Sequence, residues 1–250
     1  MITDISLYNV AMAKITVPNV KWSAEWDADD PEIERIWIFM KEMIKHLEVD
    51  DKAEDEADFM ADRIWEKLNT SRNNYQKIKK DNFTKLTTTQ QKDAFEHLYS
   101  SLWASYKDCL QSLLRTLGYD IGFMFVSDKN FKKQSEQFKK DHPNKAQLVD
   151  YAKKLRKGWQ NDLAETRNAQ HTGDFRNVKV DYNHPQTAKE LFEVVCYVIE
   201  GIFVWLTEEK LRKGWLIVVV NDDETVFGRG QRFALKHYLQ VASEDRKTTS

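Results

Sequence analysis

Residues 90–118 read QQKDAFEHLYSSLWASYKDCLQSLLRTLG, and this stretch decides the fold class. Its apolar residues recur at steps of three and four: Phe95, Leu98, Tyr99, Leu102, Trp103, Tyr106, Cys109, Leu110, Leu113 and Leu117. This spacing places them on one face of an α-helix. Gly118 follows as a natural end, since glycine readily terminates helices. The stretch predicts a long amphipathic helix whose apolar face needs other helices to cover it.

Further segments repeat the helical spacing, namely 31–47, 59–78, 145–172 and 186–211. Glycine (8) and proline (4) are rare among the 250 residues, which favours helix over a loop-rich fold. The apolar run Trp215 to Val220 predicts a buried strand, with 225–227 as a possible partner and 231–242 as a last short helix or strand. We therefore expect a mainly α protein: a bundle with a core of about four to five helices and a small C-terminal β-hairpin.

The expected domain organisation has three parts. Residues 1–89 form an N-terminal arm and helical extension, residues 90–214 the helical bundle, and residues 215–250 the β element and tail. A hydrophobic content of 41% is ample for one sizeable core. The three parts are expected to form one compact unit.

Charge and cysteine content narrow the function classes. The net charge of −2 gives no global basic field, so any nucleic-acid binding must come from a local patch. Two cysteines inside apolar helical patterns, Cys109 and Cys196, predict buried thiols in a reducing cytoplasm rather than a disulfide framework. The strongest apolar run, Val194 to Leu206, contains a glutamate and is too short to span a bilayer. We expect a cytoplasmic protein with no membrane partner.

Residues 165–173 read ETRNAQHTG, and they carry the best clue to function. An apolar stripe leads into them through Leu148, Ala152, Leu155, Trp159 and Leu163. The same steps continue to Arg167 and His171, with Asn168 beside them. Burying such groups without partners is unfavourable. They are therefore expected to pair internally or to line a polar cleft.

Arg167 and His171 lie one helical turn apart and can face the same spot. The guanidinium is a planar, permanently charged fork that suits phosphate, and an imidazole transfers protons near neutral pH. Together they are a minimal apparatus for cleaving an RNA phosphodiester without a metal, with Asn168 orienting the imidazole or contacting the nucleotide. Further candidates for RNA contact follow the motif, at Arg176, Lys179 and His184.

This segment resembles the HEPN superfamily of helical-bundle ribonucleases and RNA-binding domains, whose signature is an Arg, often followed by a polar residue, and then a His late in a bundle helix. Arg167-Asn168 and His171 match it, and residues 90–212 match its helix layout. Three residues separate Arg167 from His171, whereas the family usually has four to six. The resemblance implies catalytic roles for these three residues, a homodimer in which two motifs line one cleft, and an antitoxin or defence partner protein.

Other interpretations stay open. An Arg and a His at a helix C-terminus also favour the helix dipole and cap carbonyls, which is a purely structural role. A non-catalytic RNA- or protein-binding module is one alternative, and a magnesium-dependent all-α nucleotide pyrophosphohydrolase is another. The acidic residues for the latter would be Glu54, Asp55, Glu56, Asp58, Asp62, Glu190 and Glu193, although a solvated helix face explains them better. The remaining histidines are scattered, so we expect no metal site and no cofactor.

Overall fold

The computed structural model describes residues 33–79, 83–173, 185–220 and 232–237. Its α-helices are α1 (Ile33–Lys45), α2 (Asp51–Ile78), α4 (Thr88–Trp103), α5 (Leu110–Thr116), α6 (Asp128–Asp141), α7 (Gln147–Lys157), α8 (Trp159–Thr172) and α9 (Pro185–Thr207). Shorter turns are the π-helical η2 (Ala104–Cys109) and the 3-10 segments η3 (Gly122–Phe125), η4 (Pro143–Lys145) and η5 (Glu208–Lys210). The strands are β1 (Trp215–Val220) and β2 (Arg232–His237). The expected mainly α bundle with a small β-hairpin is confirmed.

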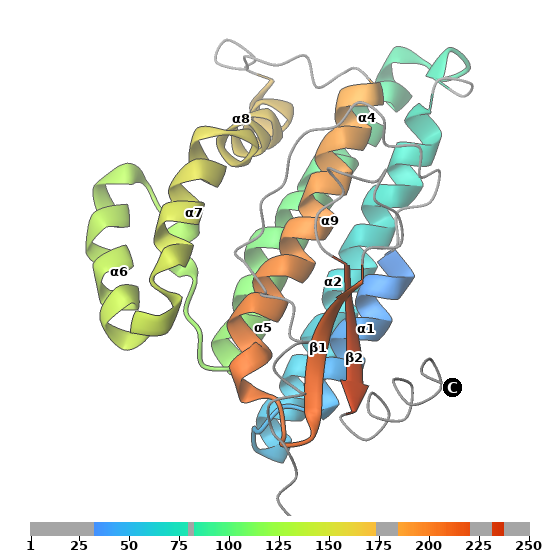
Figure 1. Ribbon diagram of the computed structural model, residues 1–250. Coiled ribbons are helices and arrows are strands. Elements are labelled where there is room, and N and C mark those ends of the chain that lie inside the picture. The colour runs from blue at the N-terminus through green and yellow to red at the C-terminus, as the bar shows by residue number, and fades with distance from the viewer. Residues whose placement is uncertain (1–32, 80–82, 174–184, 221–231, 238–250) are drawn as a thin grey trace, which may run out of the picture.

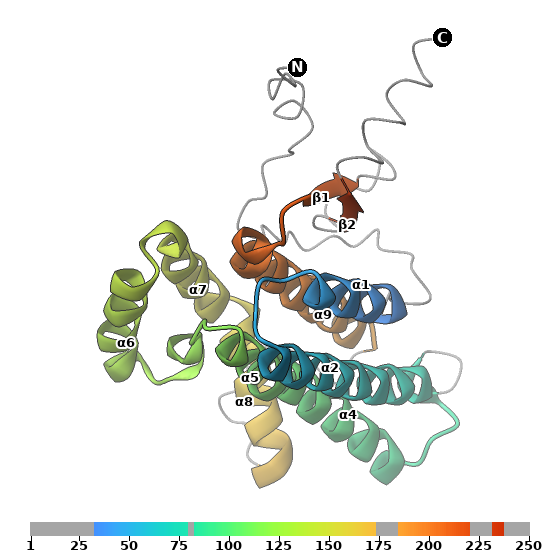
Figure 2. The same cartoon turned by 90° about the horizontal axis from the view of Figure 1, so that it is seen from below.

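Helix α9 lies at the centre of the bundle (Figures 1 and 2). All residues from 191 to 207 are buried, as expected for a helix whose apolar residues occupy most of its circumference. Helices α1, α2 and α5 pack against it, and α2 also packs against α4. The buried hydrophobic cluster contains residues from each of the ranges 1–89, 90–214 and 215–250, from Ile33 in α1 to Phe233 in β2.

The stretch quoted first forms one long helical run, α4–η2–α5. It starts at a capping box, in which Thr87 accepts from the Gln90 backbone N–H and the Gln90 side chain accepts from the Thr87 backbone. It ends at Gly118, whose φ of +91° lies in the left-handed region. Between these ends the run widens into the π-helical turn η2 at Ala104–Cys109. The sequence pattern gave no sign of this turn.

The helix expected over 145–172 is two helices, and that expectation is wrong in this respect. Gly158 separates α7 from α8 with φ −103° and ψ −133°. Its N–H donates to the carbonyls of Lys154 and Leu155 and closes α7. Glycine loses more backbone entropy in a helix than other residues do, so it is a natural place for the chain to change direction. After the bend, α8 packs against α4, on the side of the bundle away from the β-hairpin (Figure 2).

Strands β1 and β2 form an antiparallel pair in which Trp215 faces His237 and Val220 faces Arg232. The hairpin packs on α1, where the Phe39 and Phe233 rings stack 6.4 Å apart. Of the two expected elements after β1, the one at 231–242 is confirmed as a strand. The other, at 225–227, lies outside the described residues.

A buried ion pair joins α1 to α9. The Glu200 side chain is fully buried, and both its oxygens accept from the Arg35 guanidinium at 2.8 Å. A carboxylate in an apolar core needs such a partner, and the bidentate fork satisfies both oxygens. The pair therefore fixes the register of α1 on the central helix.

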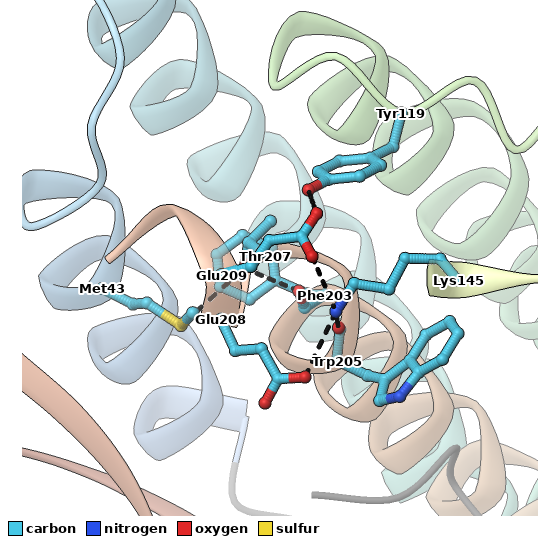
Figure 3. Close-up of polar contacts among 8 residues, drawn as sticks. All are labelled: Met43, Tyr119, Lys145, Phe203, Trp205, Thr207, Glu208 and Glu209. Carbon is cyan, nitrogen blue, oxygen red and sulfur yellow. Dashed lines mark hydrogen bonds and ion pairs between the residues drawn. The ribbon is translucent and has the colours of Figure 1, made fainter. Parts of the chain in front are cut away.

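A second buried charge lies where α9 ends (Figure 3). Lys145 is 5% exposed, and its ammonium donates to the Trp205 carbonyl at 2.5 Å and to Glu208 Oε1 at 3.2 Å. Tyr119 donates to Glu209 Oε1 at 2.7 Å, and Glu209 Oε2 lies 3.7 Å from the same ammonium. A cation at a helix C-terminus satisfies unpaired carbonyls. This cluster ties the α6–α7 insertion to the bundle.

In the described part of the chain, no helix is both long enough and apolar enough to cross a membrane.

Candidate functional site

The buried face of α8 runs through Trp159, Leu163, Thr166 and Gln170. It does not continue through Arg167 and His171 as the stripe suggested. A helix has 3.6 residues per turn, so successive steps of four move gradually away from the buried face. The buried face therefore continues from Leu163 by a step of three to Thr166. Arg167 is half-buried at the edge of this face, and His171 is exposed.

The His171 imidazole is held against α4. Its Nδ1 lies 3.2 Å from Glu96 Oε1, and its Nε2 lies 3.4 Å from Ser100 Oγ. Glu96 and Ser100 are four residues apart, so the same face of α4 presents both to the ring. The His171 side chain is 44% exposed. A carboxylate on Nδ1 favours the tautomer that carries its proton there, which leaves Nε2 as the basic nitrogen.

Arg167 and Asn168 line a hollow of about 430 Å³. The hollow is bounded by the end of α4, by η2, by residues 125–128 and by α8. The Arg167 guanidinium donates from Nη1 to Asn168 Oδ1 at 3.1 Å. Its Nε is buried, and no hydrogen-bond acceptor for it lies among the described residues. Because Arg167 lines the hollow and the bond to Asn168 uses only one of its Nη donors, further Nη donors remain for a ligand.

The structure brings Arg167 and Asn168 together, but His171 does not line their hollow. The imidazole is one turn further along α8 and contacts α4 instead. Within one chain, the three motif residues thus serve two adjoining places rather than one cleft. Arg176, Lys179 and His184, the candidates for RNA contact, lie outside the described residues.

Buried polar groups fix the position of α8. Tyr106 donates to Gln160 Oε1 at 3.0 Å, and Gln160 Nε2 donates to the Met124 carbonyl at 2.6 Å. Burial raises the pKa of the Tyr106 phenol well above its usual value, with a smaller contribution from Tyr151. The phenol therefore stays protonated and serves as a donor. This chain of bonds joins η2, residues 122–126 and the first turn of α8.

The sequence reasoning missed Glu96, Ser100 and Lys107 as site residues. Each occupies a polar position on the long helical run, where a solvated face is the usual explanation. Only the packing of α8 against α4 shows that Glu96 and Ser100 meet an imidazole. The spacing of four between Glu96 and Ser100 was the single available signal, and it is common on exposed helices.

The acidic residues proposed for magnesium mostly have other partners. Asp58 and Asp62 both contact the Lys41 ammonium at 2.9 Å, and Glu54 lies 3.3 Å from Arg212. Within the described ranges, no three His, Cys, Asp or Glu side chains are grouped so that they could hold a metal ion. The pyrophosphohydrolase alternative therefore gains no support from the described part of the chain.

Comparisons with protein-family models, with curated proteins and with solved structures found no match for this chain.

Proposed function

We propose that this protein is a HEPN-like endoribonuclease that cleaves RNA without a metal ion and works as a homodimer. The observation that carries the proposal is the exposed His171 imidazole, held through Nδ1 by the Glu96 carboxylate. One turn before it, Arg167 and Asn168 line a hollow of about 430 Å³. A proton-transfer group and a phosphate-binding group thus stand side by side on one helix, which is what metal-independent cleavage of RNA requires.

In the proposed reaction, His171 Nε2 takes the proton from a ribose 2′-OH. The oxygen then attacks the neighbouring phosphorus, and the bond to the 5′-oxygen breaks. The products are a 2′,3′-cyclic phosphate and a 5′-hydroxyl, which receives a proton from solvent or from the imidazolium. Glu96 stabilises the protonated ring, and the Arg167 guanidinium stabilises the crowded phosphate.

The homodimer explains how the two groups would reach one phosphate. Within a chain, Arg167 lines the hollow and His171 does not. Because the imidazole is 44% exposed, a second copy related by a twofold axis could bring its Arg167 opposite the first copy's His171. Twofold interfaces always create two such composite sites. Each site would then hold one imidazole and one guanidinium from different copies.

The test is cleavage of RNA by the purified protein in EDTA. We expect cleavage by the wild-type chain, and a loss of about 1000-fold or more in His171→Ala and in Arg167→Ala. Lys52→Ala, on the exposed first turn of α2, is the matched control and retains full activity. Thermal melting verifies that each variant is folded. Cleavage that requires magnesium, or that survives His171→Ala, would disprove the proposal.

Mixing the two inactive variants tests the composite site. If each site draws on both copies, Arg167→Ala and His171→Ala refolded together recover about a quarter of the wild-type activity, because half of the dimers are mixed and each mixed dimer has one intact site. No recovery would mean that both residues act within one chain or on separate steps.

The second candidate is a non-catalytic RNA-binding module. It is favoured by one specific observation, namely that His171 faces α4 while Arg167 and Asn168 line the hollow. RNA that is bound but never cleaved, with binding weakened by Arg167→Ala and unchanged by His171→Ala, would support this module over the nuclease.

A further inference from the structure

A second, larger hollow lies beside the first. It has a volume of about 550 Å³ and is enclosed by η2, α5, residues 120–126 and α6. Three glutamine side chains, Gln111, Gln134 and Gln137, line it together with the Phe138 ring. A glutamine amide offers both donors and an acceptor, which suits the mixed polar edge of a nucleobase. The Gln137 amide already donates to Asp141, and the buried Phe138 ring supplies an apolar floor. The volume is within the range of ligand pockets.

The two hollows share a wall. Lys107, Phe125 and Val126 line both of them. Arg156, which also lines the smaller hollow, holds the wall in place by donating to the carbonyls of Met124 (3.1 Å) and Val126 (2.6 Å). A ligand that occupies both hollows must therefore cross this wall beside Lys107.

Lys107 belongs to the π-helical turn η2. Such turns are rare and occur frequently at functional sites, because the extra residue displaces side chains from their ordinary helical positions. The Lys107 ammonium lies 5.9 Å from the Trp103 ring centre. It forms no ion pair with a carboxylate in the described part of the chain. Its charge is thus available to an anion at the boundary of the two hollows.

Most acidic side chains around the two hollows already form an ion pair or a hydrogen bond. Asp128 is paired with Arg156, and Asp120 with Arg115. Asp141 accepts from the Gln137 amide at 2.8 Å. Glu165 is exposed on the rim of the smaller hollow. The cations that remain for a ligand are Lys107 at the wall and Arg167 beyond it.

We propose that the two hollows bind consecutive nucleotides of single-stranded RNA, with one base in the larger hollow, the linking phosphate at Lys107, and the next nucleotide between Trp103 and Arg167. This inference rests on the proposed recognition of RNA and names its substrate class. A base must be unpaired to enter the larger hollow, because paired bases present only their groove edges. Stacking on the partly buried Trp103 ring tolerates any base.

The test measures binding of short fluorescent 2′-O-methyl oligonucleotides, which cannot be cleaved because the attacking hydroxyl is blocked. We expect the single strand to bind at least about 10-fold tighter than its duplex. Lys107→Ala should weaken binding of every sequence about 3- to 10-fold and lower the salt dependence by about one phosphate contact. Gln111→Ala should alter the preference between bases. The control Lys52→Ala should bind as the wild type does. Lys107→Arg keeps the positive charge and should recover most of the affinity that Lys107→Ala loses.

Equal affinity for single strand and duplex would overturn the inference, as would unchanged binding in both Lys107→Ala and Gln111→Ala. The nuclease proposal is tested separately, by the cleavage of RNA rather than by the binding of these oligonucleotides. If the wild-type chain cleaves no RNA but the oligonucleotide pattern holds, the hollows bind RNA and the nuclease proposal falls. If RNA is cleaved and the pattern is absent, the nuclease stands and the nucleotide pockets fall.

Discussion

The His171 imidazole and the Glu96 carboxylate lie 3.2 Å apart. Ser100, which also contacts the ring from α4, precedes His171 by 71 residues in the sequence. This contact joins the last turn of α8 to the middle of α4. It fixes the ring plane, and a substrate hydroxyl would replace the 3.4 Å contact of Nε2 with Ser100 Oγ. The first prediction follows from this geometry.

Glu96→Gln should lower the rate of RNA cleavage about 10-fold with little change in KM. The amide keeps the length of the side chain but no longer stabilises the protonated ring, and groups that orient a catalytic His typically have effects of this size. The measurement is steady-state kinetics on one single-stranded RNA. Glu56→Gln, on the exposed surface of α2, is the control. A Glu96→Gln enzyme with full activity would contradict an orienting role.

Lys145→Met should lower the free energy of unfolding by about 3 kcal/mol, since it leaves a carbonyl and a desolvated carboxylate without their cation. Tyr119→Phe removes one hydrogen bond to Glu209 and should lower it by about 1 to 2 kcal/mol. Urea unfolding measures both values (Figure 3). A loss below 1 kcal/mol in Lys145→Met would show that the cluster is dispensable.

The loss in Lys145→Met should also depend on pH. Burial raises the pKa of Glu208, while Lys145 opposes that rise. Without the lysine, the pKa of Glu208 rises further, and the folded state binds its proton more tightly than the unfolded state does. The free energy of unfolding of the variant then falls as the pH rises from the pKa of Glu208 in the unfolded chain to its higher pKa in the folded variant. Lys145→Met should therefore be closer to the wild type at pH 5 than at pH 7, and a constant difference would contradict this account.

Arg35→Met should lower the free energy of unfolding by about 2 kcal/mol, because it removes the bidentate partner of the buried Glu200 carboxylate. This value is below the usual range because the Arg35 side chain keeps 30% exposure. The double variant Arg35→Met/Glu200→Leu should be more stable than Arg35→Met alone, since no buried charge is left over. The measurement is a double-mutant cycle by urea unfolding. Additive losses would show that the pair is not coupled.

The two thiols should be unreactive in the native protein. Burial raises the pKa of both Cys109 and Cys196, and the thiolate is the reactive form. At pH 8, a chromogenic disulfide reagent should react with the folded chain about 100-fold more slowly than with the urea-unfolded chain. The unfolded chain should release two equivalents, one for each cysteine. Rapid reaction of either thiol in the native protein would contradict its burial.

Much of the secondary structure could be read from the sequence because strong local signals set it. Thr87 with Gln90 forms a capping box, and Gly118 ends the long helical run in the left-handed region. Pro185 opens α9, and its residues 191–207, most of them apolar, are all buried. Helix propensity, end signals and apolar spacing each depend only on residues that are close in the sequence. They can therefore be recognised without knowing the rest of the fold.

The candidate site could be predicted only in part. The motif on α8 was visible as a polar interruption of an apolar stripe, and the half-buried Arg167 beside a hollow agrees with a polar lining. The direction of His171 was not visible, because it depends on the bend at Gly158 and on which turn of α4 receives the ring. The proposed roles of Arg167, Asn168 and His171 in cleavage remain predictions.

The sequence by itself determined that this chain forms apolar-faced helices and a short β element, because periodicity and end signals are local properties of the chain. Tertiary structure alone decided that His171 meets Glu96, that Arg167 and Asn168 share a hollow without His171, and that a π-helical turn places Lys107 between two hollows. These relationships join segments far apart in sequence. They follow from how whole helices pack, and that packing is set by the combined burial of the core rather than by any one segment.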